Sequence, residues 1–229
     1  MDHKAVNIFC LQLKDNYPAN VLEKWLEYLP DYMQQDYSGY RKASDQHKYL
    51  FGRLLLLYGL TQYGGYDLNI LNTLKYNAYG RPYIESDIDF NISHSGDIIL
   101  CALSKNSRVG VDVEKVELLD IIDFEPILSD WEQQEIRLSD HSLNRLYEIW
   151  TIKESLVKAI GRGLSIPLNE ISSQQNPVIY ENKKWYFSKL LLGNGYMSHL
   201  TTDMPVAELS FINVSDSRIL SSFSYFCNK

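Results

Sequence analysis

The sequence predicts a mixed α+β protein. Two long segments have apolar residues at helical spacing and end at glycines, and alternating segments typical of strands lie between and after them. These elements do not alternate strictly as in a doubly wound fold. A chain of 229 residues is long enough for one large domain or two small ones. We place a boundary near residue 105, between an N-terminal lobe at 1–105 and a C-terminal lobe at 106–229.

The first long helix is expected from Asp45 to Tyr63. Its apolar residues recur every three or four positions, and two glycines follow as terminators. Basic residues lie just before the helix or on its polar edge, where solvated side chains are common. They are Arg41, Lys42, Lys48 and Arg53.

From Asp89 to Val113 the pattern becomes that of strands. Apolar residues alternate over 98–102 and again over 109–113, with a turn signal at 105–107. We therefore expect a hairpin between these two strands.

The C-terminal half continues with a helix and further strands. Ser129 and Glu132 form a capping-box pattern, and a long helix is expected over 143–160, before Gly161. Short strands are expected around 178–192 and 207–225.

Composition excludes several classes of protein. The net charge is −7, with 45% apolar and 22% charged residues, so a nucleic-acid-coating protein is not expected. Cys10, Cys101 and Cys227 are too far apart for a disulfide framework or a zinc site, which favours the cytoplasm. No apolar run approaches the roughly 20 residues that span a bilayer.

Two carboxylates share one face of a predicted strand. In the segment 109–114, side chains alternate, so Asp112 and Glu114 point away from the valines. Solubilising acids on a surface strand would give the same pattern. Gly110 adds a further signal, because a glycine within a strand often marks close approach by a ligand or another backbone.

The second long helix adds a charged cluster. Trp150, Glu154 and Lys158 are spaced four apart on one face, and Lys153 adjoins Glu154. An ordinary Glu154–Lys158 helix pair explains part of this pattern. However, charges in a partly buried helix require a counter-ion or a ligand. Three carboxylates and two lysines are suitable for holding Mg²⁺ against phosphates.

A third cluster precedes the hairpin. Adjacent side chains of a strand diverge, so Ser93 and His94 are poorly placed as a nucleophile and its base. A phosphate-binding cradle explains them better, together with Arg81 and Pro82 upstream.

In this order, the three motifs resemble those of the 4′-phosphopantetheinyl transferases, in particular the larger single-chain type typified by the surfactin synthetase activator. The segments are 80–82 with 90–95, 109–114, and 150–161. The resemblance implies two pseudo-symmetric α+β lobes. It also implies a monomer that transfers phosphopantetheine from coenzyme A to a serine of an acyl or peptidyl carrier protein, releasing adenosine 3′,5′-bisphosphate.

The resemblance also implies roles for individual residues. Asp112, Glu114 and Glu154 would hold Mg²⁺, or Mn²⁺ as an alternative, and Glu154 is the candidate base. Lys153 and Lys158 would neutralise the phosphates. Asp112, Glu154 and Lys158 would thus be the catalytic residues. Residues that would bind coenzyme A are Arg41, Lys48, Arg81, Pro82, Asn91, Ser93, His94, Lys153 and Lys158.

Three features of the sequence allow more than one interpretation. Family members often have a basic residue where this chain has Asp36, and Arg41, Lys42 or Lys48 is a candidate substitute. A metal-dependent nuclease and a coenzyme A or carrier-binding module without catalysis are the alternative functions. The apolar segment 116–131 is either lobe core or a docking surface for the carrier.

Overall fold

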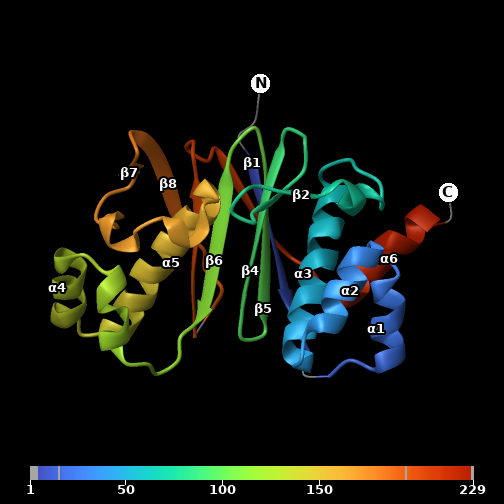
Figure 1. Ribbon diagram of the computed structural model, residues 1–229, viewed down its shortest axis with the longest axis horizontal. Helices are drawn as coiled ribbons and strands as arrows, with labels where there is room; N and C mark the ends of the chain where they lie inside the picture. The colour runs from blue at the N-terminus through green and yellow to red at the C-terminus, as the bar shows by residue number, and fades with distance from the viewer. Residues whose placement is uncertain (1–4, 15, 194, 228–229) are drawn as a thin grey trace.

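A computed structural model describes residues 5–14, 16–193 and 195–227. Two sheets lie at the centre, and helices cover their outer faces (Figure 1). The first sheet has the strand order β10-β1-β5-β4, and the second has the order β6-β9-β8-β7. The strands are β1 (Ala5–Gln12), β2 (Lys75–Tyr76), β3 (Pro82–Tyr83), β4 (Ile88–Ser95), β5 (Ile98–Lys105), β6 (Val109–Lys115), β7 (Val178–Tyr180), β8 (Lys183–Lys189), β9 (Tyr196–Thr202) and β10 (Glu208–Asn213). The helices are α1 (Ala19–Leu26), α2 (Asp31–Gly39), α3 (Ala43–Gln62), α4 (Asp130–Leu138), α5 (Ser142–Ile160) and α6 (Asp216–Cys227), with 3₁₀ helices η1 (Ile70–Thr73), η2 (Ile121–Ile127), η3 (Gly163–Ser165) and η4 (Leu168–Glu170).

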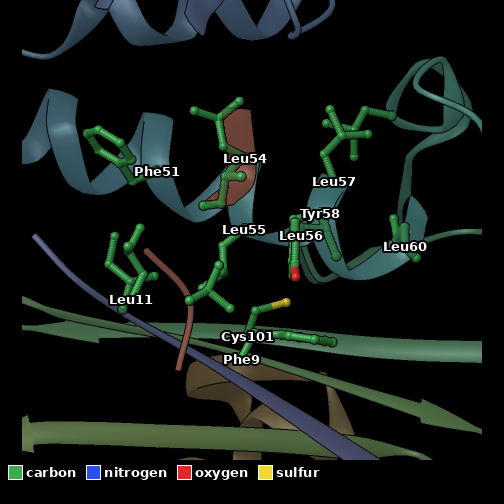
Figure 2. Close-up of a cluster of buried hydrophobic side chains, with 14 of the residues drawn as sticks. Phe9, Leu11, Phe51, Leu54, Leu55, Leu56, Leu57, Tyr58, Leu60 and Cys101 are labelled. Atoms are coloured by element: carbon green, nitrogen blue, oxygen red, sulfur yellow. The ribbon is translucent and has the colours of Figure 1, made fainter. Parts of the chain in front are cut away.

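The core of the first lobe lies between α3 and the first sheet. Figure 2 shows leucines of α3 above Phe9 and Leu11 of β1 and Cys101 of β5. The predicted helix over 45–63 is confirmed, because α3 spans Ala43–Gln62. Its dense run of leucines is buried against the sheet.

The inner faces of the two sheets form a second core. Ile8 of β1 and Leu100 of β5 pack in one cluster with Val111 of β6. Helix α5 covers the outer face of the second sheet. A Cβ on Gly110 would lie 2.1 Å from the carbonyl oxygen of Ser155 in α5. The close approach that Gly110 permits is therefore made by the backbone of a helix.

The second lobe confirms the local signals in the sequence. The Ser129–Glu132 capping box is present at the start of α4. Helix α5 ends at Gly161, whose φ of 79° is left-handed, as expected for a glycine terminator. The strands predicted around 178–192 are β7 and β8.

The hairpin predicted between the strands over 98–102 and 109–113 is wrong. Strand β5 pairs with β1 and β4, whereas β6 pairs with β9 in the other sheet. The two apolar faces pack against each other across the layers, in the same buried cluster. Alternation identifies an apolar face but does not distinguish edge pairing from face packing.

The C-terminal segment differs from the prediction in two ways. Strand β10 pairs in parallel with β1, so it belongs to the first sheet, although it lies within the predicted C-terminal lobe. The strand expected over 207–225 ends at Asn213, and helix α6 follows. Ile219 and Phe223, four residues apart, are buried in the core of the first lobe. This helical stripe explains why the chain leaves the strand conformation.

Two further expectations concern the cysteines and membranes. Cys10 and Cys101 are buried free thiols, and the side chain of Cys227 lies outside the described residues. Within the part of the chain that the structure describes, none of the helices combines the length and the hydropathy needed to cross a bilayer.

Candidate active site

Strands β4 and β6 meet where the two sheets join, and side chains link them. Every second side chain of β4 accepts a hydrogen bond from a backbone N–H of β6 that lies twenty residues later in the chain. We call this row the β4–β6 seam. Its pairs are Asp89 with Val109 (2.8 Å), Asn91 with Val111 (2.9 Å), Ser93 with Val113 (3.3 Å) and Ser95 with Lys115 (3.0 Å).

Arg81 closes one end of the seam. Its guanidinium forms a bidentate pair with Asp89, at 2.9 and 2.8 Å, and its Nε donates to the carbonyl oxygen of Lys158 at 2.9 Å. It also donates to the carbonyl oxygens of Phe90 and Val109. The side chain is buried, so its donors are committed to joining β4, β6 and α5. This arrangement does not support the predicted phosphate contact.

Asp112 and Lys158 form the centre of the site. Asp112 is 2% exposed, and its Oδ1 accepts from the Nζ of Lys158 at 2.5 Å and from the Oγ of Ser93 at 2.9 Å. Lys158 also donates to Ser93 at 2.9 Å. The Oδ2 of Asp112 is buried and has no hydrogen-bond partner among the described residues. An orphaned carboxylate oxygen of this kind is costly unless a cation or a donor reaches it.

The ionised forms of the two glutamates beside Asp112 are disfavoured. Burial, and then the charge of Asp112, raise the pKa of Glu154 on α5. The same two causes raise the pKa of Glu114 on β6, although Ser95 donates to its Oε2 at 2.8 Å. One nearby lysine does not supply enough positive charge to neutralise three neighbouring carboxylates.

The donor set fits a hard divalent cation. Carboxylate oxygens are the ligands that Mg²⁺ prefers, and the orphaned Oδ2 of Asp112 is available to one. Within the described ranges, however, no three acidic, histidine or cysteine side chains already form a metal-binding group. Lys158 instead supplies the charge next to Asp112.

Lys153 points away from this centre. Its ammonium is fully buried and pairs with Glu132 at 2.6 Å. It also donates to the carbonyl oxygens of Ile127 and Leu168, at 2.9 and 2.8 Å. These three contacts occupy its three N–H donors and hold α4 and two short helices against α5. The predicted role of Lys153 in phosphate neutralisation has no support from this placement.

Pockets lie on both sides of β4. His94 faces α3, where Lys48, Arg53 and Tyr49 help to line a basic pocket of about 330 Å³. Ser93 faces the seam, as expected for the next residue of a strand, so it and His94 do not form a single cradle. The helical pattern predicts Arg53 only as a basic residue on the polar edge of α3, whereas its Nε is buried without a hydrogen-bond partner among the described residues.

The second pocket, of about 310 Å³, is largely apolar. It reaches from Pro82 and Tyr79 to Leu168, with Glu154 and Lys158 at its border. Asn91 lines this pocket as well as holding the seam.

Two predicted features lie outside the pockets. Arg41 is exposed in the turn before α3 and is not part of the lining of the basic pocket. In the segment 116–131, most apolar side chains pack in or against a small buried cluster, but Leu118 and Ile122 are 97% and 66% exposed. The segment is therefore mainly lobe core with a small apolar surface.

Two family models match the chain. Residues 18–106 match a model described as "4′-phosphopantetheinyl transferase, N-terminal", and residues 108–204 match "4′-phosphopantetheinyl transferase superfamily". Together they cover well over half of the chain. The chain belongs to the 4′-phosphopantetheinyl transferase superfamily. The resemblance of the three motifs and the expected fold of two sheet-and-helix lobes are thus confirmed.

Curated members of the superfamily show how far the similarity extends. The 4′-phosphopantetheinyl transferase gsp of Aneurinibacillus migulanus is 37% identical over 66% of this chain and 65% of its own length. The transferase Sfp of Bacillus subtilis is 27% identical over 66% of this chain and 68% of its own. An L-aminoadipate-semialdehyde dehydrogenase-phosphopantetheinyl transferase of Xenopus laevis is 29% identical over 60% of each. The matched part of the chain spans about two thirds of these relatives or less.

Proposed function

We propose that this protein transfers the 4′-phosphopantetheine group of coenzyme A to a serine hydroxyl of an apo acyl or peptidyl carrier protein. The serine oxygen forms a bond to phosphorus, the pyrophosphate P–O bond breaks, and adenosine 3′,5′-bisphosphate leaves. The observation that carries this proposal is the hydrogen-bonded group of Asp112, Ser93 and the half-buried Lys158 at the junction of the lobes, with the carboxylates of Glu114 and Glu154 beside it.

The residues of the site would bind the metal ion, contact the phosphates and accept the serine proton. Asp112, Glu114 and Glu154 would hold Mg²⁺ or Mn²⁺, which supplies positive charge beside the pyrophosphate when bound. Lys158 would move its ammonium from Asp112 to a phosphate oxygen. Glu154, whose raised pKa makes it a better base than an exposed glutamate, would accept the serine proton.

The basic pocket is suited to the 3′-phosphate of coenzyme A. Lys48 and Arg53 supply its positive charge, which exceeds the single negative charge of Asp45, and the buried Nε of Arg53 still lacks a partner among the described residues. Burial, and then the charge of Lys48, lower the pKa of His94, so its imidazole serves as a neutral hydrogen-bonding group. The apolar pocket beside Glu154 and Lys158 is suited to an uncharged part of the same molecule. These two pockets replace the single cradle of Arg81, Ser93 and His94 that we expected from the sequence.

The carrier protein is the second proposed partner, and its contact would be largely apolar. Leu118 and Ile122 are exposed shortly after the strand that bears Asp112 and Glu114.

We propose a monomer, because one chain supplies both lobes around the site. The free, buried Cys10 and Cys101 support a reducing compartment such as the cytoplasm.

The direct test is the mass of the carrier. An apo carrier protein incubated with the protein, coenzyme A and Mg²⁺ should gain one phosphopantetheine group on a serine, as mass spectrometry would show. A module that only binds coenzyme A would leave the mass unchanged, and a nuclease would cleave nucleic acid instead. An unmodified carrier across a panel of acyl and peptidyl carriers would contradict the proposal.

The carboxylates are tested separately. Asp112→Ala and Glu154→Ala should each nearly abolish transfer while the chain stays folded, because each removes an oxygen at the point where charge develops. Glu114→Ala should cost less, since water can replace a peripheral ligand. Turnover with Mg²⁺ and after EDTA treatment is the measurement. Mg²⁺-dependent turnover at the wild-type level in Asp112→Ala would disprove the metal assignment.

A further inference from the structure

We propose that Ser95 is a positioning residue, which holds the carboxylate of Glu114 in place from the opposite lobe. Ser95 ends β4, whereas Glu114 lies on β6 of the second sheet. The Oγ of Ser95 donates to the Oε2 of Glu114 at 2.8 Å. The same Oγ accepts from the backbone N–H of Lys115 at 3.0 Å, so both its proton and a lone pair have a defined partner.

The same arrangement occurs two residues earlier in β4. Ser93 donates to the carboxylate of Asp112 and accepts from the N–H of Val113. In each case, the serine accepts from the residue twenty positions later and donates to the carboxylate nineteen positions later. Because side chains of a strand repeat every two residues, the seam presents both serines to the two acids of β6 in one register.

Through this register, a serine of the first lobe orients a carboxylate of the second lobe. Glu114 is only half-buried, and burial and Asp112 disfavour its charge. A long acidic side chain in such a place tends to turn towards solvent unless a donor holds it. Outer partners that orient ligating carboxylates commonly change metal affinity by roughly 10- to 100-fold when they are removed.

The inference rests on the proposed metal site, so its test measures metal binding directly. Mn²⁺ binding to the full chain without coenzyme A is followed by electron paramagnetic resonance. Ser95→Ala should raise the dissociation constant for Mn²⁺ by roughly tenfold, whereas Ser95→Thr, which keeps the hydroxyl, should restore most of the affinity. At saturating Mn²⁺, the KM for coenzyme A should stay within about twofold, because Ser95 does not line either pocket.

A matched control and a double-mutant cycle complete the design. Ser104→Ala removes a buried hydroxyl from neighbouring β5 that has no hydrogen-bond partner among the described residues, and it should leave Mn²⁺ binding unchanged. Glu114→Gln should weaken Mn²⁺ binding as well, and adding Ser95→Ala to it should have little further effect, because the serine acts through the glutamate.

The outcomes separate the inference from the proposed function. If the wild type binds Mn²⁺ and Ser95→Ala binds it equally well, the positioning role is disproved while the metal site stands. Equal losses in Ser95→Ala and Ser95→Thr would also overturn it, because the hydroxyl would not be the cause. If the wild type itself binds no Mn²⁺, both the metal site and this role for Ser95 are refuted.

Discussion

The contacts of Lys158 differ from those that the helix pattern predicts. Its expected partner was Glu154, one helical turn earlier, in a surface pair worth roughly 0.3 to 0.5 kcal/mol. In the structure its ammonium contacts Asp112 and Ser93, which lie on two strands from different sheets. The Asp112 side of this pair is almost fully buried, so losing the lysine would leave an uncompensated charge.

We predict that Lys158→Ala lowers turnover at least tenfold, since loss of about 1.4 kcal/mol of transition-state stabilisation already has that effect. The metal-free variant should also melt at a lower temperature than the wild type, because Asp112 loses its counter-ion. Added Mg²⁺ should restore part of that loss. Lys158→Arg should recover only part of the rate, because a planar guanidinium differs in shape from a compact ammonium.

Steady-state kinetics and thermal unfolding with and without Mg²⁺ are the measurements. A Lys158→Ala protein with wild-type turnover and an unchanged melting temperature would contradict both the catalytic and the structural part.

The sequence indicates which charged residues lie near one another at the candidate site, but not the partners of all of them. Asp112, Glu154 and Lys158 could be predicted because their strand and helix periodicities place them on defined faces. Arg81 and Lys153 could not be separated from them, because their partners are Asp89, Glu132 and main-chain carbonyl oxygens that only the folded chain brings near. Charge type alone does not show whether a cation meets a ligand or a buried acid.

At the scale of elements, contact between β6 and α5 positions the acids against the lysine. Gly110 allows this contact, since a Cβ there would lie 2.1 Å from the carbonyl oxygen of Ser155 and 2.4 Å from the amide nitrogen of Ala159. Both are backbone atoms of a helix, which cannot turn away as a side chain can. The strand and helix could be predicted separately, but their contact joins residues too distant for any periodic signal.

Gly110→Ala should therefore lower the free energy of unfolding by roughly 1 to 3 kcal/mol, the usual cost of overpacking. It should also lower turnover, because it moves β6 away from α5. Gly39→Ala is the control: it ends α2, its added Cβ would meet no atom within 4 Å, and no loss of stability is expected. Urea unfolding of both variants measures the difference. Equal stability of Gly110→Ala and the wild type would show that the strand has room to shift.

At the scale of the whole molecule, stability should depend on pH through His199. This side chain of β9 is 2% exposed, and its Nδ1 lies 2.7 Å from the Oγ1 of Thr151 on α5. Burial lowers the pKa of His199 from 6.5 to about 4, although Glu148 opposes the shift and Lys189 and Arg145 add to it. The unfolded chain therefore binds a proton between about pH 6.5 and pH 4 that the folded chain does not.

The free energy of unfolding should fall as pH drops through this range, by roughly 3 kcal/mol in total at about 1.4 kcal/mol for each pH unit. His199→Gln removes the titrating group, so its unfolding free energy should change less over the same range. Chemical unfolding from pH 7 to pH 4 provides the comparison. Identical pH slopes for the two proteins would mean that His199 is protonated in the folded state.

The return of the chain to its first sheet has a consequence for recombination between members of the superfamily. Because β10 lies parallel to β1 and α6 packs on α3, the first lobe is assembled from both ends of the described chain. A chimaera made with a single crossover near residue 105 would pair β1 of one parent with β10 of the other. Two crossovers, one between β5 and β6 and one between β9 and β10, would exchange an entire second lobe and leave the parental β1–β10 pairing intact.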